Sequence, residues 1–131
     1  MSDRPTVRVV AAVIERDGRY LITQRRPSAV LPLMWEFPGG RVETGESDSD
    51  ALRREVKFRL GVDVKPQQLI SFVSHPYDRY IVDLYLYDCA LVGGEPQCNN
   101  VNSFQWASSA EFDQYTFTPA DELSMTKLLG L

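Results

Sequence analysis

Residues 40–62 read GRVETGESDSDALRREVKFRLGV and contain the strongest helix signal in the chain. Ser47 is a good N-cap, and Gly61 is a natural helix stop. Three apolar residues recur every four positions, which places them on one stripe of a helix. They are Leu52, Val56 and Leu60. These signals predict a helix over residues 47–60 with one buried face.

Strand and turn signals surround this helix on both sides. Before it, residues 7–15 and 19–24 read as strands around an Asp17-Gly18 turn, and residues 25–35 read as a loop. After it we expect strands at residues 68–74, 80–91 and 103–107, a short helix from Ser108, and a last helix over residues 118–129 with Pro119 at its first position. This order predicts an α+β fold, a mixed sheet flanked by helices, in a single domain spanning residues 1–131.

Composition sets limits on the partners and the location of the chain. Of 131 residues, 44% are hydrophobic and 24% charged, and the net charge is −4. A net negative chain lacks the basic surface that binds DNA or RNA duplexes, but a small phosphorylated ligand needs few arginines. Residues 1–6 contain no apolar run typical of a signal peptide, no stretch is long enough to cross a membrane, and the two cysteines, Cys89 and Cys98, give no disulfide framework. We therefore expect a cytoplasmic protein with no membrane partner.

The stretch from Gly40 to Val62 resembles the Nudix box of the MutT-like pyrophosphohydrolases. That pattern is a glycine, five residues, a glutamate, seven residues, and then Arg-Glu-U-x-Glu-Glu-x-Gly-U, where U is a bulky apolar residue. The matching residues are Gly40, Glu46, Arg54, Glu55, Val56, Gly61 and Val62. Segments 9–15, 21–27, 35–40 and 118–121 also look like the 8-oxo-dGTP and CTP pyrophosphohydrolase branch. The resemblance implies a Nudix α/β/α sandwich with a mixed sheet, and hydrolysis of a nucleotide with Mg²⁺ or Mn²⁺.

Two positions depart from the pattern, and both concern the metal. Phe58 and Arg59 stand where the family has paired glutamates. Positions 55, 58 and 59 share one side of a helix, so their summed charge is 0 instead of −3. A divalent ion about 5 Å from the Arg59 guanidinium would be repelled by roughly 7 kcal/mol at an effective dielectric constant of about 20. Glu46 and Glu55 remain as the candidate metal ligands, and they make a weak site.

The resemblance also gives roles to individual residues of the box. Glu46 and Arg54 look like the ion pair that braces loop and helix. Glu55 is the candidate catalytic base or weak metal ligand, and its alternative role is an ion pair with Arg59 or another arginine. Arg59 either binds phosphate directly or is a solvated charge at the helix end. Phe58 either packs in the core or closes the former metal cavity.

Further candidates for the ligand site lie outside the helix. Arg25 resembles a nucleotide-contacting position, although an exposed strand arginine is the alternative. Asp121 resembles the position that contacts the base edge, and its alternative is an acid stabilised by the helix dipole. Tyr77, with Tyr80, offers a stacking surface or an aromatic edge of the core. The aromatic and glycine-rich turn contributes Phe37, Gly39 and Gly40.

Three functions remain open at this point. The first is a binding module that holds a nucleoside di- or triphosphate, or a related phosphorylated ligand, with impaired or absent hydrolysis. The second is an active pyrophosphohydrolase with a non-standard divalent metal site. The third is a protein-interaction domain with a vestigial pocket.

Overall fold

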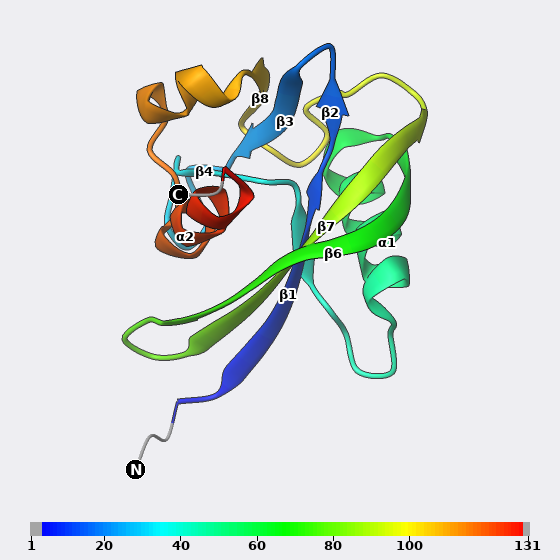
Figure 1. Ribbon diagram of the computed structural model, residues 1–131. Helices are drawn as coiled ribbons and strands as arrows, with labels where there is room; N and C mark the ends of the chain where they lie inside the picture. Colours follow the sequence, from blue (N-terminus) through cyan, green and yellow to red (C-terminus); the bar gives the residue numbers. More distant parts are fainter. Residues whose placement is uncertain (1–3, 130–131) are drawn as a thin grey trace.

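A computed structural model describes residues 4–129 (Figure 1). Its elements in chain order are β1 (Thr6–Val13), β2 (Glu15–Arg16), β3 (Arg19–Gln24), β4 (Trp35–Glu36), β5 (Gly39–Arg41), α1 (Asp48–Leu60), β6 (Asp63–Pro76), β7 (Ile81–Gly93), β8 (Ser103–Ala107), the 3-10 helix η1 (Ser109–Gln114) and α2 (Pro119–Leu128). The prediction that residues 1–6 are no signal peptide falls partly on Met1–Asp3, which lie outside the described residues.

The strands form two sheets. The first has the order β5-β1-β7-β6, and in the second β3 pairs with β2, β4 and β8. β1 and β7 run parallel, from Thr6 opposite Ile81 to Val13 opposite Asp88, while β1–β5 and β6–β7 are antiparallel. The predicted mixed sheet in an α+β fold is therefore confirmed.

Helix α1 begins one residue after the predicted start, with Ser47 as its N-cap, and ends at Leu60 as predicted. The Ser47 hydroxyl accepts a hydrogen bond from the Asp50 backbone N–H, which caps the N-terminus. Gly61 ends the helix at φ 71°, a left-handed conformation that glycine adopts without strain. Leu52, Val56 and Leu60 are all buried, as expected for the core-facing stripe.

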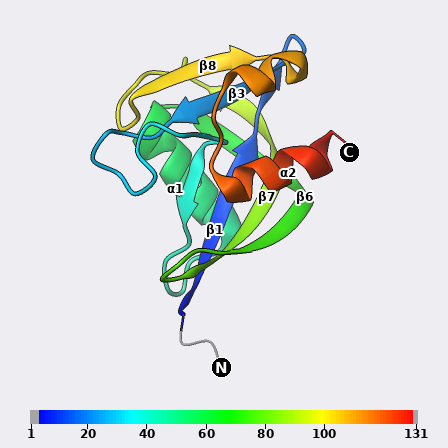
Figure 2. The ribbon, with the colours of Figure 1, turned by 90° about the vertical axis from the view of Figure 1, so that its left-hand side faces the viewer.

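The C-terminal half of β1 is buried on both faces and separates two hydrophobic clusters. Val10 and Ala12 pack with α1, whereas Ala11 and Val13 pack with residues of α2 and η1. This division follows from the alternation of side chains along a strand. Figures 1 and 2 accordingly show α1 and α2 on opposite sides of the sheet that contains β1.

The predicted limits of one strand were wrong. β6 extends well beyond residues 68–74, whereas β7 lies within two residues of the predicted 80–91 at each end, and the two strands form one long hairpin from Asp63 to Gly93. Irregular pairing between Pro66 and Leu69 breaks the alternation, so the local pattern marked only part of β6. The first strand was also predicted too long, because β1 ends at Val13 and β2 follows separately.

One side-chain prediction is corrected as well. Phe58 is 58% exposed on α1, so it does not pack in the core. Among residues 4–129, no helix has the length and apolar character needed to cross a membrane.

Candidate functional site

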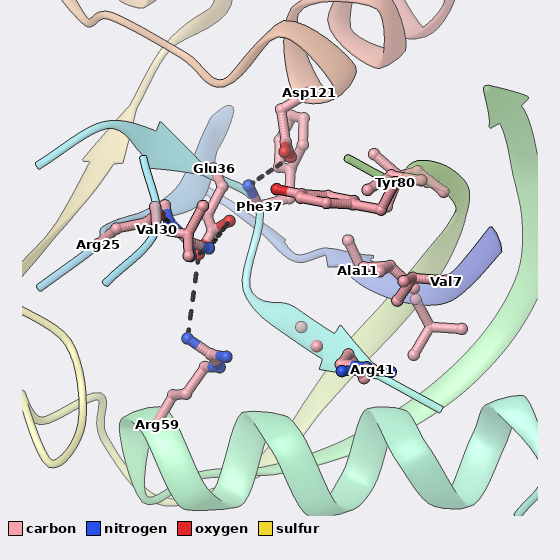
Figure 3. A pocket seen from close by; sticks show the side chains of 16 residues that line it. Val7, Ala11, Arg25, Val30, Glu36, Phe37, Arg41, Arg59, Tyr80 and Asp121 are labelled. Atoms are coloured by element: carbon pink, nitrogen blue, oxygen red, sulfur yellow. Dashed lines mark hydrogen bonds and ion pairs between the residues drawn. The ribbon is translucent and has the colours of Figure 1, made fainter. Parts of the chain in front are cut away.

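A cavity of about 390 Å³ lies between β1, the C-terminal part of α1 and the start of α2 (Figure 3). Its lining residues are Val7, Val9, Val10, Ala11, Arg25, Val30, Glu36, Phe37, Gly39, Gly40, Arg41, Arg59, Tyr80, Val82, Leu84 and Asp121. Of the predicted site residues, Arg25, Phe37, Gly39, Gly40, Arg59 and Asp121 line this one cavity. They come from segments that are far apart in the sequence.

One wall of the cavity is apolar because β1 and β7 pair in parallel. Val7 lies opposite Val82 and Val9 opposite Leu84, and all four line the cavity with Ala11. Alternate residues of each strand project to the same face, so the wall is continuous. It suits a flat, mostly apolar group.

The two glycines of β5 allow a close approach on both sides. A side chain at Gly39 would meet the Val10 carbonyl oxygen of β1, and one at Gly40 would meet the carboxylate of Glu55 on α1. Glycine is therefore required here for packing between strand, sheet and helix. The backbone of these two glycines therefore lies against other parts of the protein itself.

Both carboxylate oxygens of Glu55 are engaged by arginines. Oε1 accepts a hydrogen bond from Arg54 Nη1 at 2.7 Å, and Oε2 accepts one from Arg59 Nε at 3.1 Å. The Glu55 side chain is only 12% exposed. Its negative charge is therefore matched by two guanidinium groups, the arrangement that the ion-pair alternative described.

Arg54 also ties the loop before α1 to the helix. Its Nε and Nη2 donate to the two carboxylate oxygens of Glu46 at 2.8 and 2.9 Å, and Nη2 donates to the Arg41 carbonyl at 2.8 Å. The Arg54 hydrogen bonds, with a further one from the Glu43 backbone N–H, lower the pKa of Glu46 to about 2. This geometry is that of a brace between loop and helix.

Glu36 lies at the centre of the polar end of the cavity, and the sequence did not single it out. Its carboxylate accepts hydrogen bonds from Arg25 Nη1 at 3.1 and 3.3 Å, and Arg59 Nη1 lies 3.9 Å away. Burial raises the pKa of Glu36, although both arginines act against this. Arg25 and Arg59 are 23% and 24% exposed, so neither is a solvated surface charge. The only available sequence signal was an acid placed between two aromatic residues in a strand.

Asp121 lies close to Glu36, in the first turn of α2. It accepts hydrogen bonds from the Phe37 backbone N–H at 3.0 Å and from the Thr118 hydroxyl. Burial, and then the negative charge of Glu36, raise the pKa of Asp121 to about 7. The Phe37 side chain is 1% exposed and belongs to the core, and its backbone N–H holds the Asp121 carboxylate in place.

Tyr77 is set further back than the other predicted residues. It lines a smaller adjoining cavity of about 100 Å³, shared with Arg25, Tyr80 and Asp121. Its ring stacks on Tyr80 with the centroids 5.2 Å apart, and its hydroxyl accepts a hydrogen bond from the Ala120 backbone N–H. Tyr80 lies between Tyr77 and the larger cavity.

The residues present do not fit a divalent cation. Mg²⁺ prefers several oxygen ligands, usually carboxylates, with free coordination positions. Here the oxygens of Glu46 and Glu55 are all occupied by hydrogen bonds from arginines, and Arg59 projects into the space beside Glu55. Within residues 4–129, no group of three or more His, Cys, Asp or Glu side chains is arranged to hold a metal ion.

Comparison with known proteins gives the family. Residues 9–127 match the family model for the NUDIX domain. The chain is 34% identical over 115 residues to the CTP pyrophosphohydrolase of Escherichia coli (strain K12), covering 88% of this chain and 85% of that protein. It is 33% identical over 114 residues to a putative 8-oxo-dGTP diphosphatase 2 of Mycobacterium tuberculosis, covering 86% and 81%. The crystal structure of a MutT NUDIX hydrolase from Burkholderia pseudomallei superposes with a TM-score of 0.85 at 24% identity, covering 95% and 99%, and confirms the fold. The chain therefore belongs to the Nudix family.

Proposed function

We propose that this chain binds a nucleoside di- or triphosphate, or a related phosphorylated ligand, in the cavity beside α1, and that metal-dependent hydrolysis of this ligand is impaired or absent. The proposal takes its ligand class from relatives named for CTP and 8-oxo-dGTP. It takes the weak catalysis from the chain's own residues.

The observation that carries the proposal is that two arginines bind the Glu55 carboxylate. A metal-dependent hydrolase of this family uses a cluster of carboxylates on this helix face. Here Arg54 and Arg59 neutralise Glu55, and Phe58 adds no ligand. A metal ion would have to displace at least one guanidinium and remain beside the other, which supports loss of the metal site.

The cavity itself supports retention of binding. It combines an apolar wall, formed by β1 and β7, with the side chains of Arg25, Arg59 and Asp121. Such a cavity, apolar with few convergent polar groups, is typical of small-molecule sites. Asp121 offers carboxylate oxygens to N–H donors of a base, and the arginines offer donors to phosphates.

The test is a metal titration with a panel of nucleotides, followed by thermal melting and by phosphate release. We expect a ligand to raise the melting temperature equally with Mg²⁺ and with EDTA. A ligand at 100 times its Kd stabilises the folded chain by about 2.7 kcal/mol. We expect turnover to be no higher than in Glu55→Ala. A panel without any thermal shift would contradict the binding proposal and favour an interaction domain with a vestigial pocket.

An active pyrophosphohydrolase is the second candidate, and the identity of 34% to a CTP pyrophosphohydrolase favours it. It requires release of phosphate or pyrophosphate that depends on Mg²⁺ or Mn²⁺ and that Glu55→Ala abolishes. The double variant Phe58→Glu, Arg59→Glu supplies the positive control. If hydrolysis appears in the double variant and not in the original chain, the scaffold presents substrate correctly and only the metal ligands are missing.

A further inference from the structure

Two cavities meet at the C-terminal half of α1. The first is the ligand cavity of about 390 Å³. The second, of about 540 Å³, is more open and is lined by Arg41, Val42, Glu43, Thr44, Glu55 and Arg59. Of the described residues, only Arg41 and Arg59 line both cavities. Figure 3 shows these two side chains on the α1 side of the ligand cavity, one from β5 and one from α1.

Both arginines keep unused hydrogen-bond donors at this junction. The Arg59 side chain is 24% exposed, yet among the described residues its only hydrogen bond is from Nε to Glu55. Its Nη1 lies 3.9 Å from Glu36, which is too far for a hydrogen bond. Arg41 accepts a bond at its carbonyl, and its guanidinium has no partner within residues 4–129. Guanidinium donors without acceptors beside a cavity favour an incoming anion, most of all that of the largely buried Arg59, while Arg41 is exposed.

The carboxylates near Arg41 and Arg59 do not remove the preference of these arginines for an anion. Glu43 and Glu55 line the second cavity, and both face Arg54, at 3.8 and 2.7 Å. Glu36 is bound to Arg25. Each of these carboxylates therefore has a cationic partner other than Arg41. Glu55 accepts hydrogen bonds from both Arg54 and Arg59.

We propose that Arg41 and Arg59 together bind a phosphate group of the ligand where the two cavities meet, so that fixed guanidinium groups hold the phosphate without a divalent cation. This inference rests on the proposed function for the identity of the rest of the ligand. A guanidinium presents two parallel N–H donors to phosphate oxygens, and Arg59 stays protonated at all relevant pH values. The phosphate chain then runs from the apolar cavity toward the open one.

The test uses inorganic pyrophosphate, titrated calorimetrically in EDTA at fixed ionic strength. We expect the original chain to bind it, and Arg59→Gln and Arg41→Gln each to weaken binding about tenfold through loss of charged hydrogen bonds. Arg59→Lys keeps the charge without the fork, and its affinity should be intermediate. Arg53→Gln is the matched control, because Arg53 lies on the same helix and pairs with Asp50. Its affinity should be unchanged.

Parallel titrations with cytidine and 8-oxo-deoxyguanosine separate this inference from the proposed function. If a nucleoside binds but pyrophosphate does not bind without metal, or binds equally to both glutamine variants, the anion site is overturned and the nucleotide cavity stands. If pyrophosphate binds through the arginines and no nucleoside or nucleotide binds, the anion site stands and the nucleotide proposal fails. Should Arg59→Gln fail to fold, the exposed Arg41 carries the test.

Discussion

The two ends of α1 each carry a cluster of arginines and carboxylates, and the clusters differ in how their charges are matched. At the N-terminal end, Arg8 donates from Nε and Nη2 to both carboxylate oxygens of Asp48, at 2.9 and 2.7 Å. Tyr87 also donates to Asp48, and the Arg8 guanidinium lies 3.8 Å from the centroid of the Tyr85 ring. At the C-terminal end, Arg59 lies between Glu55 and Glu36 and retains free donors beside a cavity.

The pKa shifts of the carboxylates separate the two clusters. The hydrogen bond from Arg8, with that from Tyr87, lowers the pKa of Asp48. Burial raises the pKa of Glu36 and Asp121. The ionised carboxylate of Asp48 therefore stabilises the fold. The ionised carboxylates of Glu36 and Asp121 in the cavity instead reduce the stability of the fold. Such unfavourable placement is more common at binding and catalytic sites than elsewhere.

The largest effect on stability is expected from Asp48→Asn. Two bonds from Arg8 and one from Tyr87 lose their charged acceptor, so the free energy of unfolding should fall by about 2 kcal/mol after allowance for the half-exposed Arg8. Urea denaturation measures this. Asp63→Asn removes an exposed pair with Lys57 and should cost less than about 0.5 kcal/mol. Equal losses in the two variants would mean that the Asp48 cluster is an ordinary surface ion pair.

The raised pKa of Asp121 at the cavity should affect stability in the opposite direction to the lowered pKa of Asp48. The size of this effect should be smaller than the loss expected from Asp48→Asn. Because the pKa of Asp121 is raised to about 7, the folded chain keeps a proton that the unfolded chain releases near pH 4. The free energy of unfolding should therefore fall as pH rises from about 4 to 7. Between pH 5 and 8 the fall should be on the order of 1 to 2 kcal/mol. Glu36 acts in the same direction.

Melting curves of the original chain and of Asp121→Asn test this at several pH values. The decrease between pH 5 and 8 should be shallower in the variant. A parallel decrease in both proteins would assign it to other groups.

Among the buried carboxylates, the smallest effect on stability is expected from Glu36→Gln, which should change the free energy of unfolding by less than about 1 kcal/mol because the ionised carboxylate is already unfavourable there. The same change releases Arg25 and Arg59 from a negative charge. Pyrophosphate affinity should then rise roughly fivefold, equivalent to about 1 kcal/mol. The control is Glu95→Gln, whose side chain is 75% exposed. A large loss of stability without any gain in pyrophosphate affinity would mean that Glu36, like Asp48, serves mainly to stabilise the fold.

Most of the fold was predictable because its signals are local. The Ser47 cap, the Gly61 stop and the stripe of Leu52, Val56 and Leu60 gave α1 to within a residue at its start. The turn at Asp17-Gly18 and β3 were also placed correctly. The limits of β6 were not, because its pairing with β7 continues through residues whose own pattern is irregular.

The candidate site was predictable only in part. Arg25, Arg59 and Asp121 were named from the sequence and do line one cavity. Glu36 and Arg41 also line it and were not named, since neither is a fixed position of the motif and only the packing brings them to the cavity. For Phe58 the sequence left open core packing or closure of the former metal cavity, and its side chain is 58% exposed, which excludes core packing.

The sequence by itself determined the helix, the Nudix box and the replacement of two acids by Phe58 and Arg59, because capping, periodicity and motif spacing act over a few residues. Only the tertiary structure decided which charges meet. Arg25, Glu36 and Arg59 come from three separate segments, and the choice between a solvated arginine and one held at a cavity depends on how β4 and α1 pack around β1. Ion pairs between distant segments follow from that packing, which no local pattern records.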